Sequence, residues 1–174
     1  HTLLLQIGKQ NGIEKGYAVL FNGSLIGQII EVGKISSRVL LISDVNSMIP
    51  IVLSESRIPG IISGKNNNYL SLNFLPKDIV PNSGEIIQTS GHGGLFPSGL
   101  PIGMVDSVIN DEILIKPLAH MNSIDFVQII KWRAENVEKP DKLGIEDYKP
   151  LKLFDNQNTF EGITARKVIE WKKL

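Results

Sequence analysis

Short apolar runs rich in Ile, Val and Leu alternate along the chain with Gly, Asn, Ser and Pro. This pattern is typical of β-strands joined by turns, and no convincing helical periodicity is found before residue 133. The runs predict eleven strands, at Leu3–Ile7, Ala18–Phe21, Leu25–Val32, Arg38–Ser43, Ile49–Leu53, Gly60–Ser63, Tyr69–Phe74, Glu85–Thr89, Gly103–Ile109, Glu112–Lys116 and Phe126–Lys131. The fold class predicted from the pattern is therefore all-β.

Turn residues support several of these boundaries. Asn11-Gly12, Asn22-Gly23 and Asn82-Ser83-Gly84 supply residues that tolerate positive φ. Asn110-Asp111 is expected to close a hairpin between the strands on either side of it.

A weak internal repeat favours two related small β-barrels over one large sandwich. The segment Leu25-Ile26-Gly27-Gln28-Ile29 resembles Pro101-Ile102-Gly103-Met104-Val105, at a constant offset of 76 positions. An apolar strand follows each copy. A match this short also arises by chance in β-rich chains, so the strand pattern leaves both architectures open.

The composition changes after Trp132. The 42 positions from Arg133 to Leu174 hold 17 charged residues, against 19 in the preceding 132. We expect residues 133–174 to form a charged, linker-like tail, whose end from Phe160 to Leu174 either frays or forms a short amphipathic helix.

Charge and cysteine content narrow the possible functions. Lys plus Arg and Asp plus Glu each number 18, so no net field favours a nucleic acid or an anionic membrane surface. The absence of Cys excludes disulfides and thiolate chemistry. No apolar stretch reaches the roughly 18 residues of a spanning helix, and the start at His1, in the middle of a pattern, suggests a fragment of a longer protein.

No metal or cofactor site is predicted. The three histidines are isolated, and the sequence contains no His-x-x-His spacing or acidic cluster. Gly60-Ile61-Ile62-Ser63-Gly64-Lys65 resembles a phosphate loop but has the wrong spacing between its glycines. A strand that ends in a turn explains this segment better.

The clearest enzymatic alternative is a serine hydrolase of trypsin-like fold. It would use Ser90 with His92 or His120 and one aspartate as the orienting group. However, Ser90 and His92 lie two positions apart on one segment, whereas a triad takes its base from a different strand. No spacing singles out an orienter among Asp44, Asp78, Asp106 and Asp125.

The surrounding Gly- and Pro-rich run has a structural explanation. Its glycines permit positive φ and its prolines fix φ, so we expect a rigid connection between strands. Leu95 and Phe96 either fill the core beneath this loop or project toward a partner, and they are the candidate partner-binding residues. The residues expected to shape the loop are Thr89, Ser90, Gly91, Gly93, Gly94, Pro97, Gly99, Pro101 and Gly103.

Read whole, this run resembles the signature of the rod-shape-determining protein MreC family. It reads Thr89-Ser90-Gly91-His92-Gly93-Gly94-Leu95-Phe96-Pro97-Ser98-Gly99-Leu100-Pro101-Ile102-Gly103, and other stretches agree in order from about residue 5 to 131. His92 departs from the family pattern, which argues against its use as a base.

The resemblance implies two small six-stranded-type barrels, trypsin-like or OB-like in style, in the extracytoplasmic part of a bitopic inner-membrane protein anchored by an upstream helix. It also implies a non-catalytic scaffold of the cell-elongation complex, without cofactor or metal. Such a scaffold self-associates, binds and activates the elongation-specific penicillin-binding transpeptidase, contacts MreD and is linked to MreB.

The resemblance also suggests a division of the strands. Residues 1–35 and 103–132 would form one discontinuous barrel and residues 36–102 the other, although two consecutive barrels fit the strand pattern equally well. A peptidoglycan-binding module is a further alternative. The 6% content of aromatic residues does not favour it, because such modules display exposed aromatic rings.

Overall fold

The structure, a computed structural model, describes residues 1–76, 79–120, 124–132 and 162–171. Its strands are β1 (Thr2–Leu5), β2 (Ala18–Phe21), β3 (Ser24–Val32), β4 (Ser37–Leu41), β5 (Met48–Leu53), β6 (Pro59–Gly64), β7 (Leu70–Asn73), β8 (Ile86–Thr89), β9 (Pro101–Ile109), β10 (Glu112–Pro117), β11 (Phe126–Ile130) and β12 (Gly162–Trp171). Two short 3₁₀ helices, η1 (Lys9–Asn11) and η2 (His92–Gly94), lie between strands. Within the described ranges no helix has the length and apolarity needed to cross a membrane.

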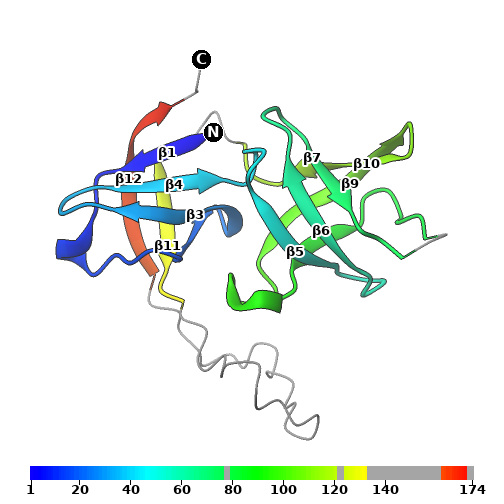
Figure 1. The fold of residues 1–174 in the computed structure, drawn as a ribbon, viewed down its shortest axis with the longest axis horizontal. Coiled ribbons are helices and arrows are strands. Elements are labelled where there is room, and N and C mark those ends of the chain that lie inside the picture. The colour runs from blue at the N-terminus through cyan, green and yellow to red at the C-terminus, as the bar shows by residue number, and fades with distance from the viewer. Residues whose placement is uncertain (77–78, 121–123, 133–161, 172–174) are drawn as a thin grey trace, which may run out of the picture.

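The strands form two barrels that lie side by side (Figure 1). In the first barrel the order is β1-β12-β11-β2-β3-β4, and in the second it is β10-β7-β6-β5-β8-β9. Without β12, the other five strands of the first barrel form a strongly curled half-barrel, which the backbone of β12 closes by pairing with β1 and β11. The prediction of an all-β chain with two small barrels is confirmed.

The two barrels share one pattern of strand pairing. The strands β5, β6, β7, β8, β9 and β10 of the second barrel correspond in order to β11, β12, β1, β2, β3 and β4 of the first. With this correspondence, every pair of hydrogen-bonded neighbours in the second barrel matches a pair of neighbours in the first. The first barrel is thus a circular permutation of the second, closed by strands from both ends of the described chain.

The repeat seen in the sequence has a matching physical basis. A Cβ on Gly27 would lie 2.4 Å from Leu40 O and 2.6 Å from Val39 Cγ1. A Cβ on Gly103 would lie 2.7 Å from both Lys116 O and Ile115 Cγ2. The two glycines and both pairs of neighbours differ by the same 76 positions, so each barrel needs glycine where β3 or β9 meets the next strand.

The strand assignment differs from the expected division in three strands. β4 belongs to the first barrel, and β9 and β10 belong to the second. The expected boundary after residue 35 cuts the β3–β4 hairpin, and the boundary after residue 102 falls inside β9. Backbone hydrogen bonding keeps such neighbouring strands in one sheet.

Both alternatives for the end of the chain, a frayed terminus and a short helix, are wrong for residues 162–171, because Gly162–Trp171 forms β12. Ile163, Thr164, Val168 and Ile169 are β-branched, which favours a strand, and β1 and β11 supply its hydrogen-bonding partners. The linker-like part of the predicted tail, residues 133–161, lies outside the described residues.

The predicted turn residues adopt the expected conformations. Gly12, Asn22, Gly23 and Gly84 all have positive φ. Asn110 and Asp111, at φ 50° and 62°, close the β9–β10 hairpin.

Each barrel has an apolar core, and the core of the second reaches into the first. Val19, Ile29, Val39 and Ile129 lie in the core of the first barrel. The cluster that fills the second barrel also contains four buried residues from β2, β3 and β11: Ala18, Leu20, Leu25 and Ile130. Alternate residues of these strands therefore serve different cores, and the apolar junction fixes the two barrels against each other.

Glu85 is a buried carboxylate that organises the β5–β6 turn. Its Oε1 accepts hydrogen bonds from Ser56 N at 2.8 Å, Ser56 Oγ at 2.9 Å and Glu55 N at 3.2 Å. Burial acts to raise the pKa of Glu85, but the hydrogen bonds from Ser56 and Glu55 outweigh it and hold the pKa below its ordinary value of 4.5.

We expect Glu85→Gln to lower the free energy of unfolding at about pH 7 by about 1–3 kcal/mol, because charged hydrogen bonds are lost. The carboxylate has a lowered pKa in the folded state, so its contribution is complete above pH 4.5 and disappears as the pH falls through the lowered value. Urea unfolding of both proteins between about pH 3 and pH 7 measures this. A stability gap that stays constant over this range would contradict the assignment.

Gly27→Ala is expected to destabilise the first barrel by about 1–3 kcal/mol, because the new methyl group would overlap backbone and core atoms. Gly33→Ala is the control, since its Cβ would meet nothing closer than 3.2 Å. Thermal unfolding compares the variants, and equal melting temperatures would show that the strands separate without cost.

Candidate partner-binding surface at the barrel junction

The signature run from Thr89 to Gly103 connects β8 to β9 and lies just below the junction of the two barrels in Figure 1, where η2 is drawn in green. Four of its glycines have left-handed φ: Gly91 at 81°, Gly93 at 73°, Gly94 at 64° and Gly99 at 89°. The sequence therefore needs glycine at each of these positions to let the chain double back.

The hydroxyl of Thr89 fastens the two ends of this loop. Thr89 Oγ1 donates to Pro97 O at 2.6 Å and accepts from Leu100 N at 2.9 Å, in a fully buried position. The Thr89 backbone also bonds Leu100 O at 2.9 Å and Gly99 N at 2.8 Å. A short turn thus satisfies polar groups that burial would otherwise leave without partners.

Phe96 and Leu100 anchor the loop in the apolar core at the junction of the two barrels, which we call the junction core. They are 5% and 6% exposed and belong to the cluster that unites the second barrel with β2, β3 and β11. Of the two candidate partner-binding residues, Phe96 therefore lies inside the protein.

Leu95 instead has 42% of its surface exposed. Gln28 of β3 holds its backbone in place, because Gln28 Nε2 donates to Leu95 O and to Gly16 O, each at 3.1 Å. The leucine side chain is thus presented outward from a fixed backbone.

A hollow lies beside Leu95 where the barrels meet, and we call it the junction hollow. Its lining comes from β3, β4, the β4–β5 connection, the start of β5 and the loop, and consists of Gly27, Gln28, Leu40, Asn46, Ser47, Met48, Ile49, Leu95 and Phe96. None of these residues carries a charge. Met48, at 63% exposure, and Leu95 form its apolar rim, which suits an apolar group of a partner.

The serine and histidine of the run have local structural roles. Ser90 Oγ accepts a hydrogen bond from the His92 backbone N–H at 3.2 Å, and Ser90 N donates to Pro50 O at 3.1 Å. The described residues hold no group of three His, Cys, Asp or Glu side chains placed to bind a metal ion. These contacts explain Ser90 as a turn residue.

The remaining loop residues shape the start of β9. Pro101 lies opposite Gln88 in the β8–β9 ladder, and Gly103 makes the close approach to β10. Sequence reasoning did not assign Gln28, Leu40 or Met48 to the site. The sequence contained a signal for Gln28 alone, which follows the repeated glycine Gly27.

Thr89→Val is expected to cost about 1–3 kcal/mol of stability, because it leaves Leu100 N–H and Pro97 O without their buried partner. Thr89→Ser keeps the hydroxyl and should lose less. Chemical denaturation gives the free energies, and amide hydrogen exchange at Leu100 should speed up in the valine variant. Unchanged exchange there would exclude the anchoring role of the hydroxyl.

Comparison with known proteins gives a consistent family. The family described as rod shape-determining protein MreC, barrel core, matches residues 1–131. The cell shape-determining protein MreC of Cereibacter sphaeroides is 31% identical over 150 residues, covering 86% of this chain and 50% of the relative. That of Listeria monocytogenes is 33% identical over 139 residues, covering 74% of this chain and 47% of the relative. The chain thus spans about half the length of these curated relatives.

Solved structures show the same fold. The structure of MreC from Listeria monocytogenes superposes with a TM-score of 0.72 at 30% identity, covering 79% of this chain and 71% of that one. Two more distant structures share the fold alone. One is the major periplasmic domain of the cell shape-determining filament MreC (TM-score 0.65, 24% identity, covering 74% and 86%). The other is MreC in complex with penicillin-binding protein PBP2 from Helicobacter pylori (TM-score 0.52, 19% identity, covering 63% and 72%).

The matched family covers both barrels except β12, the signature loop lies where the barrels join, and the curated relatives share one description. The chain belongs to the MreC family of rod-shape-determining proteins, which are non-catalytic cell-shape proteins.

Proposed function

We propose that this chain is the periplasmic part of a membrane-anchored scaffold that binds and activates the elongation-specific peptidoglycan transpeptidase. The observation that carries the proposal is the junction hollow, an uncharged recess with an exposed apolar rim on a rigid two-barrel body. An anchor upstream of His1 and links to MreD and MreB complete the proposal, as the family resemblance implies.

Two relatives support this choice of partner and place. One structural neighbour is an MreC bound to PBP2, and another is the periplasmic domain of an MreC filament. A shared fold makes a comparable protein partner and self-association reasonable for this chain.

The shape and chemistry of the hollow favour a protein side chain over a glycan. Its lining contains one aromatic residue, Phe96, and that ring is buried, whereas sugar binding usually relies on exposed aromatic faces. Leu95 and Met48 offer aliphatic and thioether surface instead, which suits an apolar anchor residue of a protein partner.

The rigid junction indicates how such a scaffold would activate its partner. Because apolar residues from both barrels share one close-packed core, we expect the hollow to change little in shape when a partner binds. A fixed surface shifts a flexible partner only by binding one of its conformations more tightly. Activation would then come from stabilising the active arrangement of the transpeptidase.

Leu95→Asp should weaken binding of the purified transpeptidase ectodomain by about 10-fold or more, because a charge would enter an apolar contact. The melting temperature should hardly change, since Leu95 is exposed. The control is Ile35→Asp, which alters a 65% exposed residue in the β3–β4 turn, outside the hollow. Biolayer interferometry measures the affinities.

Two results would contradict the proposal: no binding by the unaltered protein in a membrane mimic, or equal affinity of the Leu95 and Ile35 variants. Phe96→Asp serves as a further control. It should unfold the protein, because Phe96 is buried in the junction core.

A further inference from the structure

The side chains that β5, β6 and β7 turn outward in the second barrel are uncharged, and the Lys65–Glu112 ion pair borders them at Ser71, which hydrogen-bonds the Glu112 carboxylate. Met48 lies opposite Ser63 and Ser63 opposite Ser71, while Pro50 lies opposite Ile61 and Ile61 opposite Asn73. Directly paired residues point to the same side of a sheet, so these side chains share the outer surface. We call this surface, with the adjoining Phe74, the Phe74 face; its accessible members are Met48, Pro50, Pro59, Ile61, Ser63, Asn73 and Phe74, while Val52 and Ser71 on the same side of the sheet are buried.

The polar groups of the Phe74 face hydrogen-bond one another. Asn73 Nδ2 donates to Ser63 Oγ at 3.1 Å and to Ser71 O at 3.3 Å, and Ser71 Oγ donates to Asn73 Oδ1 at 3.4 Å. Because these polar groups already have hydrogen-bond partners within the face, a segment bound over it would remove water from few unsatisfied polar atoms. The desolvation cost that usually opposes docking on a polar sheet is reduced.

Phe74 is turned outward by its backbone. Strand alternation would send Phe74 inward after Asn73, but Phe74 has a φ of 59° and 78% of its surface is exposed. Leu75 takes the inner place instead, with its Cδ2 3.3 Å from where a Gly60 Cβ would stand. A large aromatic residue thus occupies a left-handed position that normally suits Gly or Asn, and it is held in solvent.

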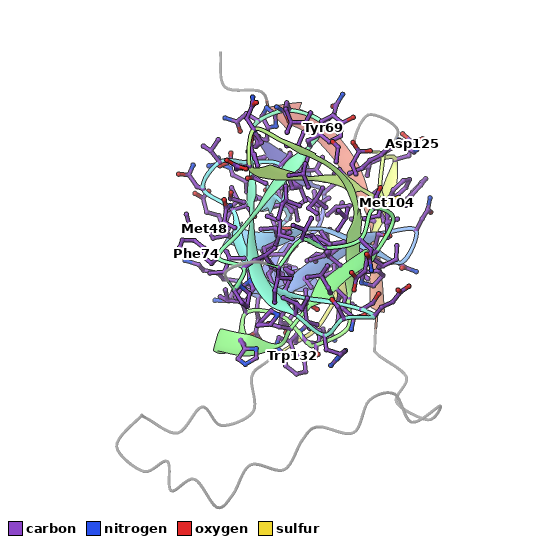
Figure 2. The ribbon with its side chains drawn as sticks, turned by 90° about the vertical axis from the view of Figure 1, so that its right-hand side faces the viewer. Met48, Tyr69, Phe74, Met104, Asp125 and Trp132 are labelled. Carbon is purple, nitrogen blue, oxygen red and sulfur yellow. The ribbon has the colours of Figure 1, made fainter. Side chains whose placement is uncertain are left out.

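The Phe74 face is continuous with the junction hollow. Met48 belongs to both, and Met48 and Phe74 project from the same side of the molecule in Figure 2. The face spans roughly 10 Å across the strands and roughly 13 Å along them, or roughly 130 Å². A stable contact between two protein copies needs about 800 Å² on each partner, so this face alone is too small for a second copy.

We propose that the Phe74 face is a second contact for the transpeptidase, which lays a short apolar, uncharged segment across it while another part occupies the junction hollow. The inference rests on the proposed function and adds the chemistry of the bound segment. A small contact of this kind gains affinity because the first contact raises its effective concentration.

The test measures binding of the purified transpeptidase ectodomain to the full-length protein in nanodiscs. Phe74→Asn removes the ring and suits the left-handed backbone, so we expect about 10-fold weaker binding with an unchanged or higher melting temperature. Ile61→Thr, a second change on the same face, should also weaken binding. Phe126→Asn is the matched control, because Phe126 is 57% exposed on β11 of the first barrel.

The loss caused by Phe74→Asn should be the same at about 0.05 M and about 0.5 M salt, since the ring that is removed carries no charge. A loss that depends on salt would refute the apolar chemistry. If Leu95→Asp weakens binding while Phe74→Asn and Ile61→Thr do not, the second contact is wrong and the proposed function stands. If the unaltered protein fails to bind, both are wrong. If Phe74→Asn changes only self-association in analytical ultracentrifugation, the face joins copies of this chain instead.

Discussion

The packing of Phe96 and Leu100 between the two barrels is the contact on which the rest of the structure depends. These side chains fill a core built from the inner face of the second barrel and from residues of β2, β3 and β11 that point away from the first. Removing this insertion would take away part of the core against which the junction residues of β2, β3 and β11 pack. Burial of apolar surface therefore sets the geometry of every feature that spans both barrels.

The insertion of Phe96 and Leu100 imposes several constraints on the conformation of the loop. The chain must leave β8, enter the junction and return to β9 within a few residues, which requires left-handed φ at Gly91, Gly93, Gly94 and Gly99. It must also bury its backbone, and the Thr89 hydroxyl satisfies the polar groups at the neck of the loop. Once the loop is fixed, Leu95 has no place in the core, and its exposure on the rim of the hollow is a consequence of the same folding.

Local chemistry made much of this fold predictable. Eleven strands and their Asn and Gly turns follow from short-range patterns, and each observed strand from β1 to β11 overlaps its predicted run. β12 was not predicted because its pairing partners are distant in sequence: β1 lies at the other end of the chain, and a charged stretch separates β11 from β12. The junction hollow depends on which strands meet, and the outward turn of Phe74 breaks the alternation used for prediction. Neither feature leaves a periodic signal in the sequence.

The permuted relation between the barrels bears on how the binding surface forms. All six strands of the second barrel are consecutive, from β5 to β10, so its contacts are relatively local, whereas the first barrel must bring β11 and β12 back to β1 and β2. Local contacts form with a lower loop-closure cost. The Phe74 face lies wholly on the second barrel, but the hollow also needs Gly27, Gln28 and Leu40 from the first. The complete proposed surface therefore exists only when strands of both barrels have folded and packed together, which would tie partner binding to the integrity of the junction.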